Sequence, residues 1–226
     1  AICCRYWSSC LLYDFSILHS LKFITLKQES ISVIIWLISG CLLIFMMVIV
    51  GGITRLTDSG LSMVDWKLFI GAIPPLNHAD WVDTFNQYKQ YPEYQKQNFM
   101  FTLSEFKTIF FWEYIHRLLG RFVGLVFIIP FIYFLIKKRL EKSLVIECLI
   151  LFFMGAMQGA IGWWMVKSGL VNNPDVSHFR LATHLTTAFL TFAYTFWVAL
   201  KLIYPNKIHF KKTLYKLSSI LMIVVI

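Results

Sequence analysis

The sequence is poor in charged residues and aromatic-rich. Charged residues fill 15% of its 226 positions, against about a quarter in an average soluble protein. Hydrophobic residues make up 58% and aromatic residues 17%. A composition this apolar excludes a soluble domain and indicates an integral membrane protein.

Cysteine is also scarce, and its spacing excludes one class of site. No two cysteines form CxxC or CxxCH, so a covalently attached c-type haem is excluded. We expect three in a cytoplasmic tail and two in or beside membrane spans, away from the oxidising side where disulfides persist. The five are Cys3, Cys4, Cys10, Cys41 and Cys148.

Four apolar segments are long enough to cross a bilayer, which takes about 20 helical residues. A fifth run begins near Leu217 and stops at Ile226. A helix of that length rises only about 15 Å, half of a bilayer, so we expect the start of an incomplete span. The four predicted spans are Ile31–Gly52, Ile109–Ile136, Leu144–Val166 and Leu181–Ile203.

The predicted fold is an all-α membrane protein. It consists of an irregular cytoplasmic tail (1–30), a four-helix transmembrane bundle (31–203), and a cytoplasmic loop with a truncated fifth span (204–226). The tail lacks an initiating Met and does not resemble a signal peptide.

The first connection is the longest. Its opening glycines, Gly51 and Gly52, and the sequence Asp58-Ser59-Gly60 suit turns. Thr102 and Glu105 match a capping box, so the second helix should start there and project about two turns beyond the membrane.

Lysine and arginine are unevenly distributed along the chain. Twelve of the 21 lie in the N-terminal tail and in the connections after the second and fourth spans. Connections rich in Lys and Arg face the cytoplasm. We therefore expect a bacterial inner-membrane protein with a cytoplasmic N-terminus and a periplasmic first loop. The net charge of +9 follows from this topology, so the expected partner is the lipid bilayer and no nucleic acid is implied.

Two histidines lie near the start of apolar segments, His116 in the second span and His184 in the fourth. Ionisable groups in a bilayer are costly and by default mark a functional site. Because these two spans run in the same direction, both imidazoles should lie at one depth in the outer half of the membrane. A haem iron is the ligand that best suits such a pair. The alternative for His184 is an interhelical hydrogen bond.

His178 competes with His184 for this role. Six helical steps separate the two side chains by about 120° around the axis, so only one can face a shared pocket. His178 follows a loop, where a surface role is expected.

Three further residues flank His116. Glu113 lies one turn outward on the same face, where it can move protons above a bound macrocycle or simply pair with Arg117. Arg117 and Arg121 share a face and suit haem propionates. Their alternative role is anchoring at the membrane interface.

Five motifs together resemble the haem A synthase family over roughly residues 31–200. The resemblance is to the alphaproteobacterial and mitochondrial type, because the first loop has no cysteine pair. The motifs are Gly51-Gly52-x-Thr54-Arg55-Leu56-Thr57-x-Ser59-Gly60-Leu61-Ser62, Gly71-x-x-Pro74-Pro75, Glu113-x-x-His116-Arg117-Leu118-x-Gly120-Arg121, Gly162-Trp163-x-Met165-Val166-x-Ser168-Gly169-Leu170 and Ser177-x-x-Arg180-Leu181-x-x-His184-Leu185.

This resemblance implies an oxidoreductase that oxidises the C8 methyl group of haem O to a formyl group by successive hydroxylations, for cytochrome oxidase assembly. The family has eight spans in two similar halves. The N-terminal half takes the substrate haem O and the C-terminal half holds a haem b cofactor. Glu113 matches the catalytic glutamate, and His116 and His184 match the pair at the substrate haem iron.

The resemblance further implies that this chain is the N-terminal half, inactive alone, because the haem b ligands belong to the other half. The implied partners are haem O synthase (protohaem farnesyltransferase) and an electron acceptor. Two other classes stay open: a b-type haem electron-transfer subunit, and a haem-free scaffold for oxidase assembly. The haems extracted from the protein would separate the three.

Overall fold

The computed structural model describes residues 31–64, 73–171 and 174–204, and this part of the chain is helical with no strand. Four helices are long and apolar enough to cross a membrane, which confirms the predicted all-α membrane bundle. They are the first helix, Ile31–Leu56, then α4 (Leu103–Ile136), α5 (Lys142–Val166) and α6 (His178–Ile203); two short helices, α2 (His78–Tyr88) and α3 (Pro92–Lys96), precede α4.

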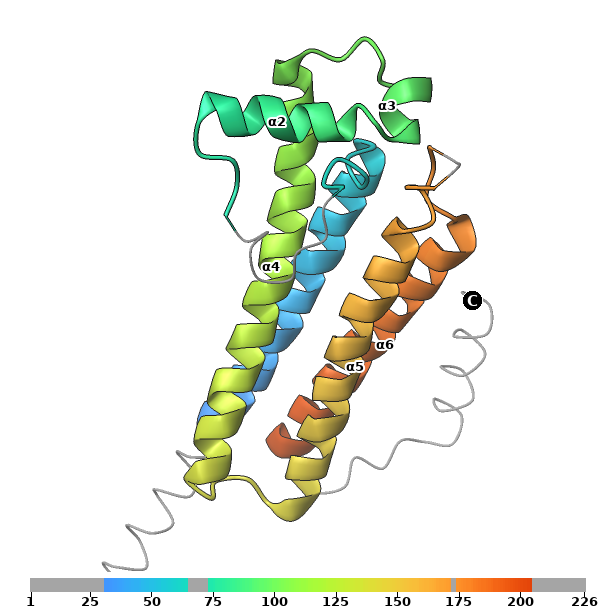
Figure 1. Ribbon diagram of the computed structural model, residues 1–226. Coiled ribbons are helices and arrows are strands. Elements are labelled where there is room, and N and C mark those ends of the chain that lie inside the picture. The colour runs from blue at the N-terminus through green and yellow to red at the C-terminus, as the bar shows by residue number, and fades with distance from the viewer. Residues whose placement is uncertain (1–30, 65–72, 172–173, 205–226) are drawn as a thin grey trace, which may run out of the picture.

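The long helices are arranged as two pairs. The first helix lies beside α4, and α5 lies beside α6 (Figure 1). Helices α2 and α3 lie across one end of the first pair. We call residues 73–102 the cap and this end of the bundle the cap end. Helices α4 and α6 both run away from the cap end, so they are parallel, as predicted for the second and fourth spans.

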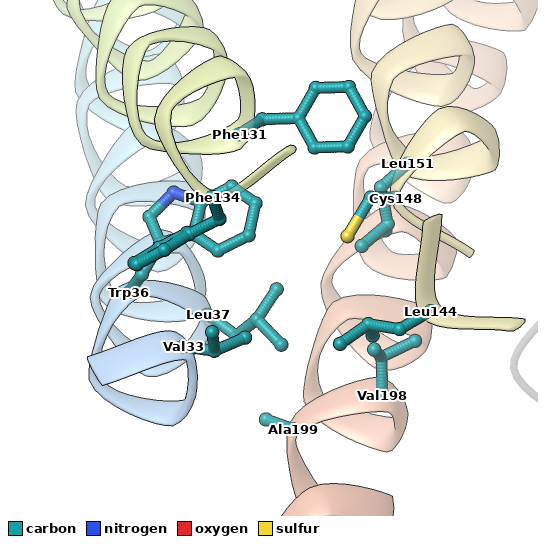
Figure 2. Close-up of a cluster of buried hydrophobic side chains, with 10 residues drawn as sticks. All are labelled: Val33, Trp36, Leu37, Phe131, Phe134, Leu144, Cys148, Leu151, Val198 and Ala199. Atoms are coloured by element: carbon teal, nitrogen blue, oxygen red, sulfur yellow. The ribbon is translucent and has the colours of Figure 1, made fainter. Parts of the chain in front are cut away.

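A buried cluster joins the two pairs at the end opposite the cap (Figure 2). Trp36 of the first helix packs in this cluster against Phe131 and Phe134 of α4, and its indole N–H donates to the carbonyl oxygen of Val126 at 2.9 Å. This bond satisfies a donor that would be costly to leave unpaired in an apolar interior. The cluster draws on all four long helices: Val33, Trp36, Leu37, Phe131, Phe134, Leu144, Cys148, Leu151, Val198 and Ala199.

A second cluster seats the cap on α4. Phe106 is fully buried, and its ring stacks on those of Phe85 and Tyr88 of α2 at centroid distances of 5.0 and 5.1 Å. Met63, from the segment after the first helix, belongs to the same cluster. Aromatic pairs at such distances add to the energy of burial, so the cap and the first turns of α4 form one packed unit.

The predicted helix boundaries hold at α4 and fail at the first helix. Thr102 and Glu105 form the predicted capping box, and α4 begins at Leu103. Of the predicted turn positions, Gly51 and Gly52 are wrong, because the first helix continues to Leu56. The turn falls at Asp58, in the predicted Asp58-Ser59-Gly60 sequence, where φ is 46°.

Two predicted segments lie outside the described residues. These are the tail, residues 1–30, and the apolar run from Leu217 to Ile226. Within the described helices, large apolar side chains such as Ile35, Phe153 and Ile129 are exposed on the outside of the bundle. Such a surface suits contact with lipid.

Candidate functional site

Each of the two histidines lies against a glycine of the helix beside it. His116 of α4 faces Gly51 of the first helix, where a Cβ atom would lie 3.0 Å from the ring atom Cε1. His184 of α6 faces Gly162 of α5, where a Cβ atom would lie 3.2 Å from Cε1. Each ring therefore fills the space that a side chain on the neighbouring helix would occupy. The two helix pairs repeat the same arrangement.

The two imidazoles also have similar surroundings. They lie close enough to interact electrostatically. In both rings Nδ1 is buried and has no hydrogen-bond partner among the described residues. An unpaired polar atom in an apolar interior is costly. A pair of such atoms is a feature of a site whose ligand is still to bind.

Glu113 lies one turn from His116 and is 3% exposed. Its Oε2 accepts hydrogen bonds from the hydroxyl of Ser62 at 2.7 Å and from the backbone N–H of Met63 at 2.8 Å. Its Oε1 pairs with the guanidinium of Arg117. Donors of this kind suit an ionised carboxylate. The carboxylate therefore ties the segment after the first helix to α4.

The two arginines form a chain along α4. Arg117 pairs with Glu113, as its alternative interpretation predicted, and also donates to the carbonyl oxygen of Met63 at 2.9 Å. Arg121 donates to the carbonyl oxygen of Arg117 at 3.1 Å. Arg117 and Arg121 thus link the segment after the first helix to α4 and to each other, one turn apart.

His178 is placed away from this site. It is the first residue of α6 and is exposed, in line with the surface role expected from its position. Near it, Arg180 donates to the carbonyl oxygen of Trp164 at 2.7 Å and lies over the Trp164 ring at 4.5 Å. This contact fixes the start of α6 to the end of α5 at the cap end.

A cavity of about 190 Å³ lies between α5 and α6, and neither histidine lines it. Thr187, three residues after His184, and Gln158, four before Gly162, are among its lining residues. Its volume is below the roughly 300–1,000 Å³ of ligand pockets. It is therefore not the space that would hold a porphyrin.

The donor set fits a haem better than a bare metal ion. Among the residues that the structure describes, no group of three His, Cys, Asp or Glu side chains could hold a metal. Two imidazoles are enough when the porphyrin supplies the remaining ligands. The pair His116 and His184 can therefore hold a haem iron between the two helix pairs.

Sequence reasoning missed the residues that complete this arrangement. Ser62 and Met63 lie about fifty positions before Glu113, and nothing local marks them as its donors. Gly51 and Gly162 are visible only as small residues in apolar helices. Such residues more often mark close helix contact than a seat for a side chain.

Comparison with known proteins supports the motifs. The family described as cytochrome oxidase assembly protein matches residues 34–226. Proteins named heme A synthase from Flavobacterium johnsoniae and Flavobacterium psychrophilum are 60% identical over 184 residues and 65% identical over 178 residues. These alignments cover 80% and 78% of this chain, and 54% and 52% of the relatives.

A third relative, named heme A synthase, comes from Nitrosospira multiformis. It is 55% identical over 173 residues, which is 76% of this chain and 49% of the relative. The chain thus spans about half the length of the curated relatives that it matches. No solved structure gives a significant match. With the family matching most of its length, and with four membrane-length helices, the chain belongs to the cytochrome oxidase assembly protein family.

Proposed function

We propose that this chain forms the substrate-haem half of a haem A synthase, an enzyme that oxidises the C8 methyl group of haem O to a formyl group. The observation that carries the proposal is the pair of histidines, each seated against a glycine and each with a buried, unpartnered Nδ1. The names of the relatives support the reaction.

In this proposal His116 and His184 hold the iron of the substrate haem O. Helices α4 and α6 are parallel and start at the same end, so they offer the two imidazoles at similar depth. Gly51 and Gly162 set the position of each ring. Two fixed rings would hold a flat macrocycle at one depth, and contacts to its propionates would fix its rotation, so that one methyl group is presented for oxidation.

Glu113 is proposed to receive protons. Converting a methyl group to a formyl group takes up the oxygen atom of a water molecule and releases electrons and protons. The electrons pass to the acceptor, and a buried site needs a group that takes the protons. Glu113 lies one turn nearer the cap end than His116 and is hydrogen-bonded to the hydroxyl of Ser62. A proton can therefore move between this carboxylate and the hydroxyl toward the cap.

Arg117 and Arg121 are proposed to bind the propionates of the haem. Arg117 contacts Glu113 and Met63, and Arg121 lies one turn further along α4. A guanidinium binds a carboxylate through two parallel hydrogen bonds. Binding a propionate would compete with the pairing of Arg117 to Glu113, which would couple substrate binding to the state of the carboxylate.

Electron transfer is assigned to the half of the relatives that the alignments with this chain do not cover. We propose that a haem b, held by the half that the relatives have in addition, supplies the electron transfer. Haem O synthase and an electron acceptor would be the partners. The cap would face the periplasm of the bacterial inner membrane, since the basic connection between α4 and α5 lies at the opposite end and basic connections face the cytoplasm.

A chimera tests the proposal. This chain is joined to the part of the Flavobacterium johnsoniae relative that it does not cover, and is expressed in cells that make haem O but no haem A. Haems are then extracted and separated by chromatography. Formyl-bearing haem A supports the synthase, unmodified haem b alone would indicate an electron carrier, and no bound haem would indicate a scaffold.

The role of Glu113 is tested in the same chimera. Replacing Glu113→Gln keeps the shape but removes the proton acceptor, so haem should stay bound while formyl product falls by about 10²–10⁴-fold. Asp83→Asn is the matched control, because it removes an exposed carboxylate of the cap that lies outside this site. Unchanged formation of haem A in the Glu113→Gln variant would reject the catalytic role.

A further inference from the structure

Within the described part of the chain two carboxyl side chains are buried, Glu113 and Glu93, and each is 3% exposed. Glu93 lies in α3, which follows α2 in the cap (Figure 1). No family motif and no part of the proposed reaction includes it. A buried carboxyl group is rare enough to need a physical reason.

The two carboxyl groups have opposite surroundings. Glu113 has a hydroxyl, a backbone N–H and a guanidinium as donors. Glu93 lies beside the hydroxyl of Tyr88, and its Oε2 is buried without a hydrogen-bond partner among the described residues. The Tyr88 hydroxyl in turn accepts a hydrogen bond from the side-chain amide of Asn98 at 2.9 Å. A carboxyl group with so few donors suits the neutral acid.

The charges that act on Glu93 all have the same sign. They come from Glu113 on α4, Asp58 after the first helix and Asp175 between α5 and α6, while the Tyr88 hydroxyl lies beside it on α2. The pKa of Glu93 is raised to about 8, mainly because the side chain is buried and further because of these negative charges. Hydrogen bonding from Tyr88 acts in the opposite direction.

Packing links Glu93 to the Glu113 site. Tyr88, the partner of Glu93, is fully buried in the cluster that also contains Met63. The backbone N–H of Met63 is one of the donors to Glu113. Tyr88 and Met63 thus belong to one packed cluster, so a displacement of Tyr88 can reach Glu113 through that cluster.

We propose that Glu93 is a positioning residue that holds a proton at neutral pH and thereby keeps the cap closed on the donors of Glu113. This role rests on the proposed function of Glu113. When Glu93 loses its proton, a second buried negative charge faces Glu113, Asp58 and Asp175. The repulsion is relieved by movement of the cap, which loosens Met63 and lowers the activity of the Glu113 site.

The first test is spectroscopic and uses this chain in lipid nanodiscs without haem. Infrared difference spectra of the chain minus its Glu93→Gln variant, between pH 6 and pH 10, should show the C=O band of a protonated acid that disappears with a midpoint near pH 8. Asp83→Asn, which changes an exposed carboxyl group of the same cap, should leave the band intact. A missing band at pH 6, or a midpoint in the ordinary range of glutamate, overturns the proposal.

A second variant keeps Glu93 itself in place. Tyr88→Phe removes the hydroxyl that favours the ionised form, so the midpoint of the Glu93 band should move to higher pH. Tyr88→Phe keeps the buried aromatic ring, so the protein should still fold. A shift of the midpoint in this variant therefore cannot be attributed to misfolding of Glu93→Gln. A midpoint that stays in place, or moves down, would contradict the assigned partner.

The second test measures activity in the purified chimera, supplied with haem O and ferricyanide as electron acceptor. If only protonated Glu93 supports turnover, the rate should fall about tenfold between pH 7 and pH 9. The ratio of the two rates should be close to one in Glu93→Gln, and Asp83→Asn should behave as the unmodified chimera. The same alkaline fall in Glu93→Gln overturns the proposal. If no chimera forms haem A, the proposed function fails instead, while the infrared titration still decides the state of Glu93.

Discussion

A methyl group at Gly51 or Gly162 should weaken haem binding without unfolding the bundle. In the variants Gly51→Ala and Gly162→Ala the new Cβ would lie 3.0 and 3.2 Å from the Cε1 atoms of His116 and His184. Both distances are shorter than an ordinary carbon–carbon contact of about 3.5–4.0 Å. Each imidazole must therefore move by a few tenths of an ångström away from its neighbouring helix.

Two effects of opposite sign determine the magnitude. Overpacking a well-packed site costs about 1–3 kcal/mol. Replacing glycine by alanine inside a helix contributes up to about 1 kcal/mol of stability. The unfolding midpoint should therefore change little, while a haem that needs each ring in its present place loses about 1–3 kcal/mol. That loss corresponds to about 5- to 150-fold weaker binding.

Matched controls exist in the same two helices. A Cβ at Gly52, the next residue in the first helix, or at Gly159, one turn before Gly162 in α5, meets no atom within 4 Å. Gly52→Ala and Gly159→Ala should gain the helix preference without moving either histidine. The assay is a titration of the purified chain with haem O, followed by its Soret absorption, beside thermal unfolding of the haem-free chain. Equal haem affinity in all four variants would refute the idea that these glycines seat the two rings.

Two further changes test the cap. Thr102→Ala removes the side chain that accepts from the Glu105 N–H and donates to its carboxylate, so the start of α4 should lose about 0.5–2 kcal/mol of helix stability. The expected signal is faster amide hydrogen exchange, confined to the first turn of α4. Unchanged exchange in that turn would contradict the prediction. For Glu93 the pKa rises from 4.5 to about 8 on folding, so its contribution to stability is fully present below pH 4.5 and is lost progressively as the pH rises through 8, by up to about 5 kcal/mol. Thermal unfolding of the chain and of Glu93→Gln at pH 6 and pH 9 measures the part of this loss above pH 6, about 3 kcal/mol, and an equal decline in both would show that another group is responsible.

Local signals in the sequence predicted the helices well. The capping box at Thr102 and Glu105 involves residues three apart, so its geometry follows from the sequence alone. The four spans were visible because a bilayer requires continuous apolar length. The exception was Gly51 and Gly52. In a soluble protein such a pair suggests a turn, but in a membrane helix the absence of a side chain lets a neighbour approach, and here that neighbour is His116.

The site was predictable only in part. His116, His184 and Glu113 stand out because ionisable residues are rare in apolar segments. Their partners depend on tertiary packing. The donors of Glu113 come from Ser62 and Met63 in the segment that follows another helix. Glu93 looks like one of many acidic residues of a polar loop, and its burial results from the way α3 is placed in the cap.

The most direct test of the account is the electron paramagnetic resonance spectrum of the ferric chain loaded with haem O, compared with the single variants His116→Ala and His184→Ala. With both imidazoles bound, the iron should be low-spin and six-coordinate. Each single variant should become high-spin, and added imidazole should restore the low-spin signal. If both variants keep the low-spin spectrum of the unmodified chain, then His116 and His184 do not share one haem iron, and the site is wrong.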